Sequence, residues 1–195
     1  MSTTLAEVDV WNMAIDLLRD APVSAVTDTT SVAKWLSRNY ANTRDRCLRR
    51  HPWNFAITRA SLSEDPTTPA FGWNHRYAIP ADCVRMLPVR YDGEYEGRIV
   101  PYELEKGYIL TDRIAPLKIR YIARIEDPTS WEPAFADYVA ASLAAKMAHW
   151  LTGKASYAKT AADMADRAYM EAIRMDGLEG SEEGPDQDDV IAARY

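Results

Sequence analysis

The sequence predicts a mainly α protein: an antiparallel helical bundle of two N-terminal and two C-terminal helices, with a β-rich insertion between helices 2 and 3 and a flexible acidic C-terminal arm. Apolar residues recur at helical spacing in the outer parts of the 195-residue chain, whereas prolines, turn residues and alternating apolar positions dominate its middle. The last residues are acidic, and their glycines interrupt helical periodicity. These observations assign residues 1–51 and 129–175 to the bundle, 52–128 to the insertion and 176–195 to the arm.

The first two helices are expected to form a hairpin. Helix 1 has a cap at Thr3 or Thr4 and ends before Pro22. Its apolar face comprises Leu5, Val8, Trp11, Ile15 and Leu18. Helix 2 begins at a cap within residues 28–31 and runs to about Arg50. Its apolar or small face comprises Val32, Leu36, Tyr40, Thr43 and Cys47. The short connection between the two predicts an antiparallel arrangement.

A proline then ends the second helix. Pro52 cannot continue the hydrogen-bond ladder and disfavours the helical conformation of His51. Trp53 and Phe55 would lie on the same side of an extended segment, because alternate residues share a face. We therefore expect Pro52, Trp53 and Phe55 to form a structural plug that joins the hairpin to the insertion.

The insertion is expected to be a sheet. Its predicted strands lie near residues 75–79, 84–91, 98–104, 108–111 and 117–125. Turn signals occur at Asp92-Gly93 and Lys106-Gly107. In the last strand every second residue is apolar or small, and Lys118, Arg120 and Arg124 alternate with them. This alternation predicts a sheet with one solvated face.

Two further helices are expected to complete the bundle. Helix 3 follows a cap at Ser130, with Pro133 in its first turn, and keeps apolar helical spacing up to Gly153. It includes Trp150 among its core positions. Helix 4 is alanine-rich and runs from about residue 154 to 175.

The charge is distributed unevenly along the chain. Residues 1–175 carry 22 charges of each sign, whereas residues 176–195 carry seven acidic residues and one arginine. Between Lys34 and Arg59 there are seven Lys or Arg and one acidic residue. The candidate inter-subunit or lumen basic face comprises Arg38, Arg44, Arg46, Arg49 and Arg50. A basic helix and an acidic arm indicate contacts between copies or with a complementary neighbour. The alternative is a solvated helix face and a disordered end.

The sequence holds little that is typical of catalysis, so we expect no catalytic residue, no metal site and no cofactor. It lacks a phosphate-cradling glycine loop, a G-x-S-x-G motif and a His-Glu-x-x-His motif. His51, His75 and His149 lie in separate elements, which is more typical of packed residues. Cys47 and Cys83 are expected to be reduced, and with His51 and His75 they fit no zinc module.

Two weaker readings of the acidic and aromatic residues stay open. Glu103 and Glu105, with nearby Trp73 or Trp131, would be the carboxylate pair of a glycosidase, although no apolar pocket is predicted to raise one pKa. Trp35 departs from the apolar face of helix 2 and is a candidate interface anchor. We expect neither a membrane span nor a signal peptide, since Lys146 interrupts the longest apolar run and the N-terminus lacks a basic region.

Three segments carry a resemblance to a known family. They are CLRRHPWNFA at residues 47–56, ASL at 60–62 and GWNHRYAIPADCVR at 72–85. Together they resemble the bacteriophage head-to-tail connector family, the adaptors or tail accessory factors of short-tailed phages and gene-transfer particles. The similarity covers the first half of the chain; the second half resembles the family only in layout. One departure is Arg19-Asp20, which stand where a glycine closing helix 1 is expected.

The resemblance implies a structural role at the head-tail junction of the virion, after synthesis in the host cytoplasm. Its implied partners are the portal protein, neighbouring copies in a twelvefold ring, the next tail component, and genomic DNA that passes through the lumen without sequence readout. No membrane is implied. The arm would bind the portal, with Val190, Ile191 and Tyr195 docking between portal subunits.

Two other classes of protein compete with this interpretation. The first is a DNA-binding packaging component, such as a small terminase subunit, that uses the five arginines on phosphates. The acidic arm and the neutral remainder of the chain argue against it. The second is an enzyme that acts on the cell wall, which a lysis assay would reveal.

Overall fold

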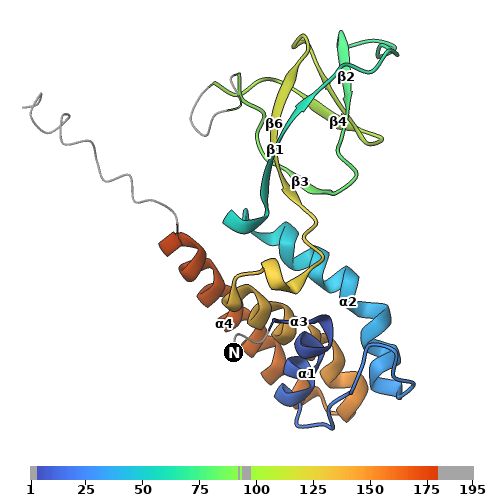
Figure 1. The fold of residues 1–195 in the computed structure, drawn as a ribbon, viewed down its shortest axis with the longest axis vertical. Coiled ribbons are helices and arrows are strands. Elements are labelled where there is room, and N and C mark those ends of the chain that lie inside the picture. The colour runs from blue at the N-terminus through green and yellow to red at the C-terminus, as the bar shows by residue number, and fades with distance from the viewer. Residues whose placement is uncertain (1–3, 92, 94–97, 180–195) are drawn as a thin grey trace, which may run out of the picture.

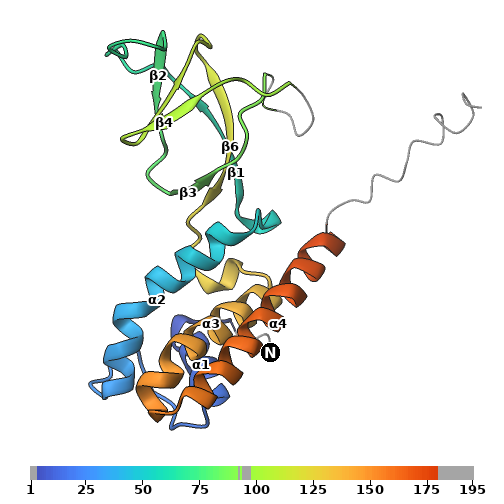
Figure 2. The same cartoon turned by 180° about the vertical axis from the view of Figure 1, so that it is seen from behind.

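The computed structural model describes residues 4–91, 93 and 98–179, arranged as a helical body and a β lobe at opposite ends (Figures 1 and 2). The helical body contains α1 (Glu7–Leu17), α2 (Ser31–Arg50), α3 (Pro133–Thr152) and α4 (Ala155–Glu179). The β lobe contains β1 (Ile57–Leu62), β2 (His75–Ala78), β3 (Cys83–Met86), β4 (Glu103–Glu105), β5 (Tyr108–Thr111) and β6 (Leu117–Ala123). Two 3-10 turns, η1 (Asn54–Ala56) and η2 (Pro128–Ser130), lie where the chain crosses between them.

The expected mainly α class is wrong: the protein is α+β. Within the described residues the strands form two three-stranded antiparallel sheets, ordered β1-β6-β3 and β2-β5-β4. These sheets enclose a hydrophobic core of their own, made by Tyr77, Val89, Val100, Ile109, Leu117, Ile119, Tyr121 and Ala123. Sequence periodicity locates strands one at a time and does not reveal that two sheets enclose a core. The middle of the chain is thus a second structural unit and not an accessory to the bundle.

The prediction of one solvated face on the last strand is also wrong. Only Lys118 is exposed in β6, and Arg120 is buried. The reason is that β6 is the central strand of its sheet, between β1 and β3. Its Tyr121 belongs to the core of the β lobe, whereas its Ile122 belongs to the core of the helical body. Both faces of β6 are therefore covered.

Helix α3 is the centre of the helical body. Figures 1 and 2 show it among the other three helices, and it packs against α1, α2 and α4. Its residues are apolar nearly all round, as expected for a buried helix. The largest of its fully buried side chains are Phe135, Leu143 and Met147. Alanines at 136, 140, 141, 144 and 148 are also buried and permit close helix approach.

The two ends of helix α2 are set by a side-chain cap and by a proline. The Thr30 hydroxyl accepts a hydrogen bond from the Ala33 amide at 3.1 Å, which caps the first turn. The helix stops at Arg50 because His51 takes an extended conformation (φ −136°, ψ 152°) ahead of Pro52. The predicted cap within residues 28–31 and the predicted stop at the proline are both confirmed.

The fourth helix is longer than expected. It continues to Glu179, so the predicted boundary between bundle and arm at residue 176 is wrong. Asp176, expected at the start of a flexible arm, is 4% exposed. The arm residues Val190, Ile191 and Tyr195 lie outside the described residues. In the described part of the chain, no helix combines the length and apolarity that crossing a membrane requires.

Helix α1 ends in a left-handed residue. Arg19 has φ +57°, and the amides of Arg19 and Asp20 donate to the carbonyls of Asp16 and Ile15 at 3.0 and 3.4 Å. This is the Schellman ending, in which the left-handed position is usually glycine. The residue that departs from the expected glycine therefore adopts the glycine conformation at some energetic cost.

Replacing Arg19 by glycine should raise the stability of the protein. Relief of the left-handed strain is expected to add about 1 kcal/mol to the free energy of unfolding. Arg38→Gly in the interior of α2 is the matched control and should lower that free energy by about 1 kcal/mol. Urea unfolding followed by circular dichroism measures both. Equal losses in the two variants would contradict the assignment of strain to Arg19.

Candidate interaction surface of the helical body

The plug residues lie at the centre of the helical body. Trp53 is completely buried, and its indole Nε1 donates to the Cys47 carbonyl oxygen at 3.0 Å. Its ring lies 5.0 Å from that of Phe135 and 6.3 Å from that of Tyr169. Phe55 stacks beside it, and the Phe55 ring is also 5.0 Å from Phe135. The plug therefore connects the end of α2 to α3 and α4, where a connection to the β lobe was expected.

The local backbone differs from the predicted extended segment. Pro52 and Trp53 are followed by η1, so Phe55 lies within a 3-10 turn. The two aromatic rings still share a side, as expected, but a turn brings them together. β1 begins at Ile57, immediately after this turn.

Asp176 fixes the last turns of α4 onto the same segment. Its Oδ1 accepts the backbone amide of Asn54 at 2.8 Å, and its Oδ2 lies 3.3 Å from Nε2 of His51. In return, the Asn54 side-chain amide donates to the Asp176 carbonyl oxygen at 2.7 Å. The sequence pattern did not predict this site. The available signal was that Asp176 continues the step of four from Ala168 and Ala172 along the packed face of α4.

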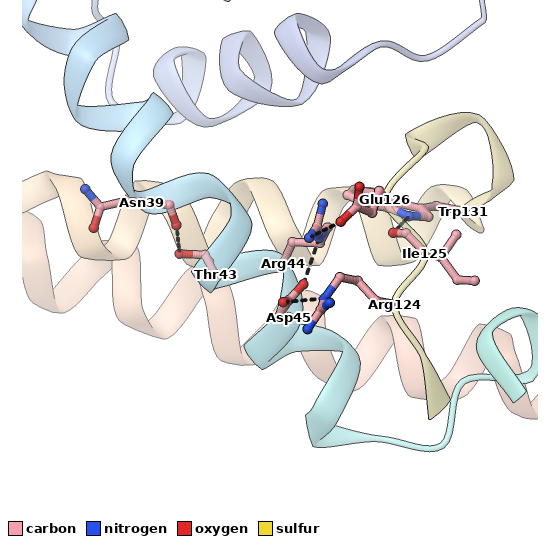
Figure 3. Close-up of polar contacts among 8 residues, drawn as sticks. All are labelled: Asn39, Thr43, Arg44, Asp45, Arg124, Ile125, Glu126 and Trp131. Atoms are coloured by element: carbon pink, nitrogen blue, oxygen red, sulfur yellow. Dashed lines mark hydrogen bonds and ion pairs between the residues drawn. The ribbon is translucent and has the colours of Figure 1, made fainter. Parts of the chain in front are cut away.

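Arg44 does not belong to an exposed basic face. It is buried, and its guanidinium points from α2 to the segment that follows β6 (Figure 3). Its Nε donates to Asp45 at 2.9 Å and its Nη2 to Glu126 at 3.3 Å. Asp45 also accepts a bond from Arg124 at 2.9 Å. This network joins the two lobes and explains the correction, because burial of Arg44 depends on partners about 80 residues away.

Arg49 also contributes to the joint between the lobes. Its guanidinium donates to the Val84 carbonyl oxygen of β3 at 2.6 Å. Arg85 of the same strand donates back to the Arg49 carbonyl oxygen at 2.9 Å. Of the five arginines of the expected basic face, Arg44 is therefore buried. Arg38, Arg46, Arg49 and Arg50 are exposed, and Arg49 also bonds to β3.

A groove between α2, α3 and α4 is lined by four basic side chains. Its volume is about 520 Å³. Arg46, Arg49 and Arg50 reach it from α2 and Lys146 from α3, and Asp166 of α4 is the acidic residue among those that line it. Arg38 is not part of it. Lys146 was not predicted as a site residue. The signal in the sequence was a single lysine within a largely apolar, alanine-rich helix, which indicates a position that reaches solvent or a polar partner.

The end of the groove near α4 is already occupied by internal contacts. The Arg50 guanidinium lies 3.7 Å from the centroid of the Tyr169 ring, a cation–π geometry. It also donates to the Tyr138 hydroxyl at 3.3 Å and approaches Asp166 at 3.6 Å. Burial raises the pKa of Tyr138 to about 12, so its hydroxyl stays protonated at neutral pH.

The other end of the groove carries Lys146 and Arg46. The Lys146 ammonium donates to the Thr43 hydroxyl at 2.7 Å. Among the described residues neither Lys146 nor Arg46 forms an ion pair. Burial lowers the pKa of Lys146, and the positive charge of Arg46 lowers it further. An anion placed here would relieve repulsion between the two cations.

The candidate tryptophan anchor has an internal partner. Trp35 stacks on Trp150 with ring centroids 6.0 Å apart and an interplanar angle of 25°. Trp150 is 46% exposed, so its expected place in the core is wrong. The pair forms an aromatic patch on the outside of the body, at the end of α3.

The residues of the weaker enzymatic reading are divided between the two lobes. Glu103 and Glu105 are exposed on β4, and Glu103 accepts the indole N–H of Trp73 at 3.0 Å. Trp131 lies in the helical body, where its indole donates to the Ile125 carbonyl oxygen at 3.0 Å. Within residues 4–91, 93 and 98–179 no group of three or more His, Cys, Asp or Glu residues is placed to hold a metal ion.

Neither comparison with known proteins identifies a relative: no family model matches the chain, and no curated protein matches it significantly.

Proposed function

We propose that this chain is the subunit of a head-to-tail adaptor, a ring under the portal vertex that extends the DNA channel and supports tail attachment. The observation that carries the proposal is the placement of the HPWNFA segment. It forms the junction of α2, α3 and α4, through Trp53 and the contacts of Asn54 with Asp176, and β1 follows it directly in the chain. This segment of the family resemblance therefore holds the helical body together at the point where the chain leaves it for the β lobe.

A two-lobed subunit suits this role. A ring subunit needs different contact surfaces on its two flanks and on its two ends. The helical body and the β lobe have separate cores, and the bonds of Arg44 and Arg49 hold them together. The basic groove supplies one candidate flank for contact with an acidic partner. Burial of Arg44 removes one of the five arginines from the competing DNA-binding interpretation.

Electron microscopy of the chain mixed with the portal protein of the same particle tests the proposal. We expect a collar of density on one face of the portal, with a subunit number that follows the portal's twelvefold symmetry. A chain ending at Asp189 lacks Val190, Ile191 and Tyr195 and should lose attachment if the arm binds the portal. Failure of the full chain to bind portal, together with tight and salt-sensitive binding of duplex DNA, would favour the packaging component instead.

In the absence of portal, the chain is expected to be a folded monomer or a weak oligomer. Among the described residues, the large exposed apolar side chains are distributed over both lobes, as with Phe71, Ile114 and Met170. Ring formation would then depend on the portal as a template. Size-exclusion chromatography with light scattering should give a mass near 22.0 kDa. A tight dimer in dilute buffer would contradict this prediction.

A further inference from the structure

The end of the basic groove that holds Arg46 and Lys146 is suited to an anionic ligand, and the neighbouring side chains indicate which kind of anion would fit. Arg46 and Lys146 lie close enough for one charge to lower the pKa of the other, and no described carboxylate neutralises them. The groove wall beside them is formed by small side chains, including Ser142, Ala145 and Ala162, which leave room for an extended chain. Such a site fits a peptide that carries carboxylates at short intervals.

The chain itself supplies such a peptide. Residues 180–195 follow α4 directly and contain Glu182, Glu183, Asp186, Asp188 and Asp189 against one basic residue, Arg194. The α4 wall of the groove reaches Asp166, thirteen residues before Glu179, which is about 20 Å along a helix. Sixteen extended residues span about 50 Å, so the segment can return to the groove.

The contacts along α2 mark a path for this return. At the end of α4, Asp176 contacts His51; nearer the groove, Asp166 contacts Arg50. The row from His51 through Arg50 to Arg46 therefore leads from the end of α4 to the unpaired cations. A tethered segment has an effective concentration in the millimolar range, which favours its own groove over that of another molecule in dilute solution.

We propose that the acidic segment 180–195 folds back on its own chain and lies in the groove between α2, α3 and α4, with its carboxylates paired to Arg46 and Lys146. The contact is weak and salt-sensitive, since it depends on partly exposed charges. It is a property of the isolated chain and does not depend on the adaptor function. A portal-bound arm would first have to leave this groove.

Zero-length carbodiimide cross-linking of the full chain tests the proposal, because the reagent joins a lysine amine to a carboxylate that touches it. In the monomer fraction, Lys146 should be linked to a carboxylate between Glu182 and Asp189, and 0.5 M salt should suppress the link. Lys34 and Lys106, at the far end of α2 and in the β lobe, are internal controls that should give at least fivefold less of this product.

A matched pair of charge reversals separates groove binding from general attraction. Arg46→Glu should reduce the Lys146 link at least fivefold, whereas Arg38→Glu, on the same helix but outside the groove, should leave it unchanged. Thermal melts of both variants check that the body is intact. The proposal is overturned if the link is absent, if it occurs only in the dimer fraction, if Lys34 and Lys106 react equally, or if the two variants behave alike.

Discussion

Trp53→Ala is expected to lower the free energy of unfolding by about 3–5 kcal/mol. The indole is completely buried among Phe55, Phe135, Tyr138 and Tyr169, so its removal leaves a cavity with rigid aromatic walls. Domains of this size are typically stable by about 5–15 kcal/mol, so the loss would threaten folding outright. Urea unfolding followed by circular dichroism measures the effect.

Two controls resolve its origin. Trp53→Phe keeps most of the ring but leaves the Cys47 carbonyl oxygen without its indole donor, and should cost about 1–3 kcal/mol. Trp73→Ala removes a half-buried indole from the β lobe and should cost less than either. An unchanged melting temperature for Trp53→Ala would show that the plug is not the centre of the body.

Asp176→Ala should cost about 2–3 kcal/mol, the second largest effect that we expect. The Asp176 carboxylate, which is 4% exposed, accepts the Asn54 backbone amide, and a hydrogen bond to a charged group contributes about 1.5–3 kcal/mol. The reciprocal bond from the Asn54 side chain to the Asp176 carbonyl would remain. The loss is measured by thermal and urea unfolding, with Glu179→Ala, at an exposed position of the same helix, as the control.

A pair of truncations tests the same contact without a substitution. A chain ending at Glu179 should melt close to the full chain, whereas a chain ending at Met175 should lose more stability than Asp176→Ala, because it also lacks the Asp176 carbonyl that accepts the Asn54 side chain. This revises the expectation that residues 176–195 act as one detachable arm. Equal melting of the two truncated chains would show that Asp176 contributes nothing to the fold.

The sequence predicted best where structure is decided locally. The cap of α2 within residues 28–31 and its stop at Pro52 depend on residues within one helical turn, and both predictions are confirmed. The caps expected at Thr3 or Thr4 and at Ser130 are wrong, since α1 begins after Ala6 and α3 after Glu132. Arg44 and Asp176 were misplaced because their partners lie 82 and 122 residues away, as Glu126 and Asn54. Hydrophobic periodicity places charged residues on the surface, and it cannot predict that a partner distant in the sequence will bury one of them.

The candidate groove could not be predicted from the sequence for the same reason, because it is formed by segments distant in the chain. Arg46, Arg49 and Arg50 were recognised as basic residues on one helix, but their common setting depends on α3 and α4 packing beside α2. Lys146 becomes a site residue only through that packing, which places its ammonium on Thr43. The uneven charge of the sequence indicates a charged partner for the basic helix. Only the tertiary structure shows which of the basic residues are free of internal ion pairs and can contact that partner.

The central strand β6 has a consequence for how this chain can vary. Tyr121 and Ile122 are neighbours in sequence yet belong to different cores, because successive side chains of a strand point to opposite faces. Inserting one residue ahead of them would exchange the two sets of side chains and place each in the wrong core. We expect insertions to be tolerated at the turn around Gly107, where neighbouring space is open, and to be excluded from β6. The register of β6 therefore determines which of its side chains enter the core of the helical body and which enter the core of the β lobe.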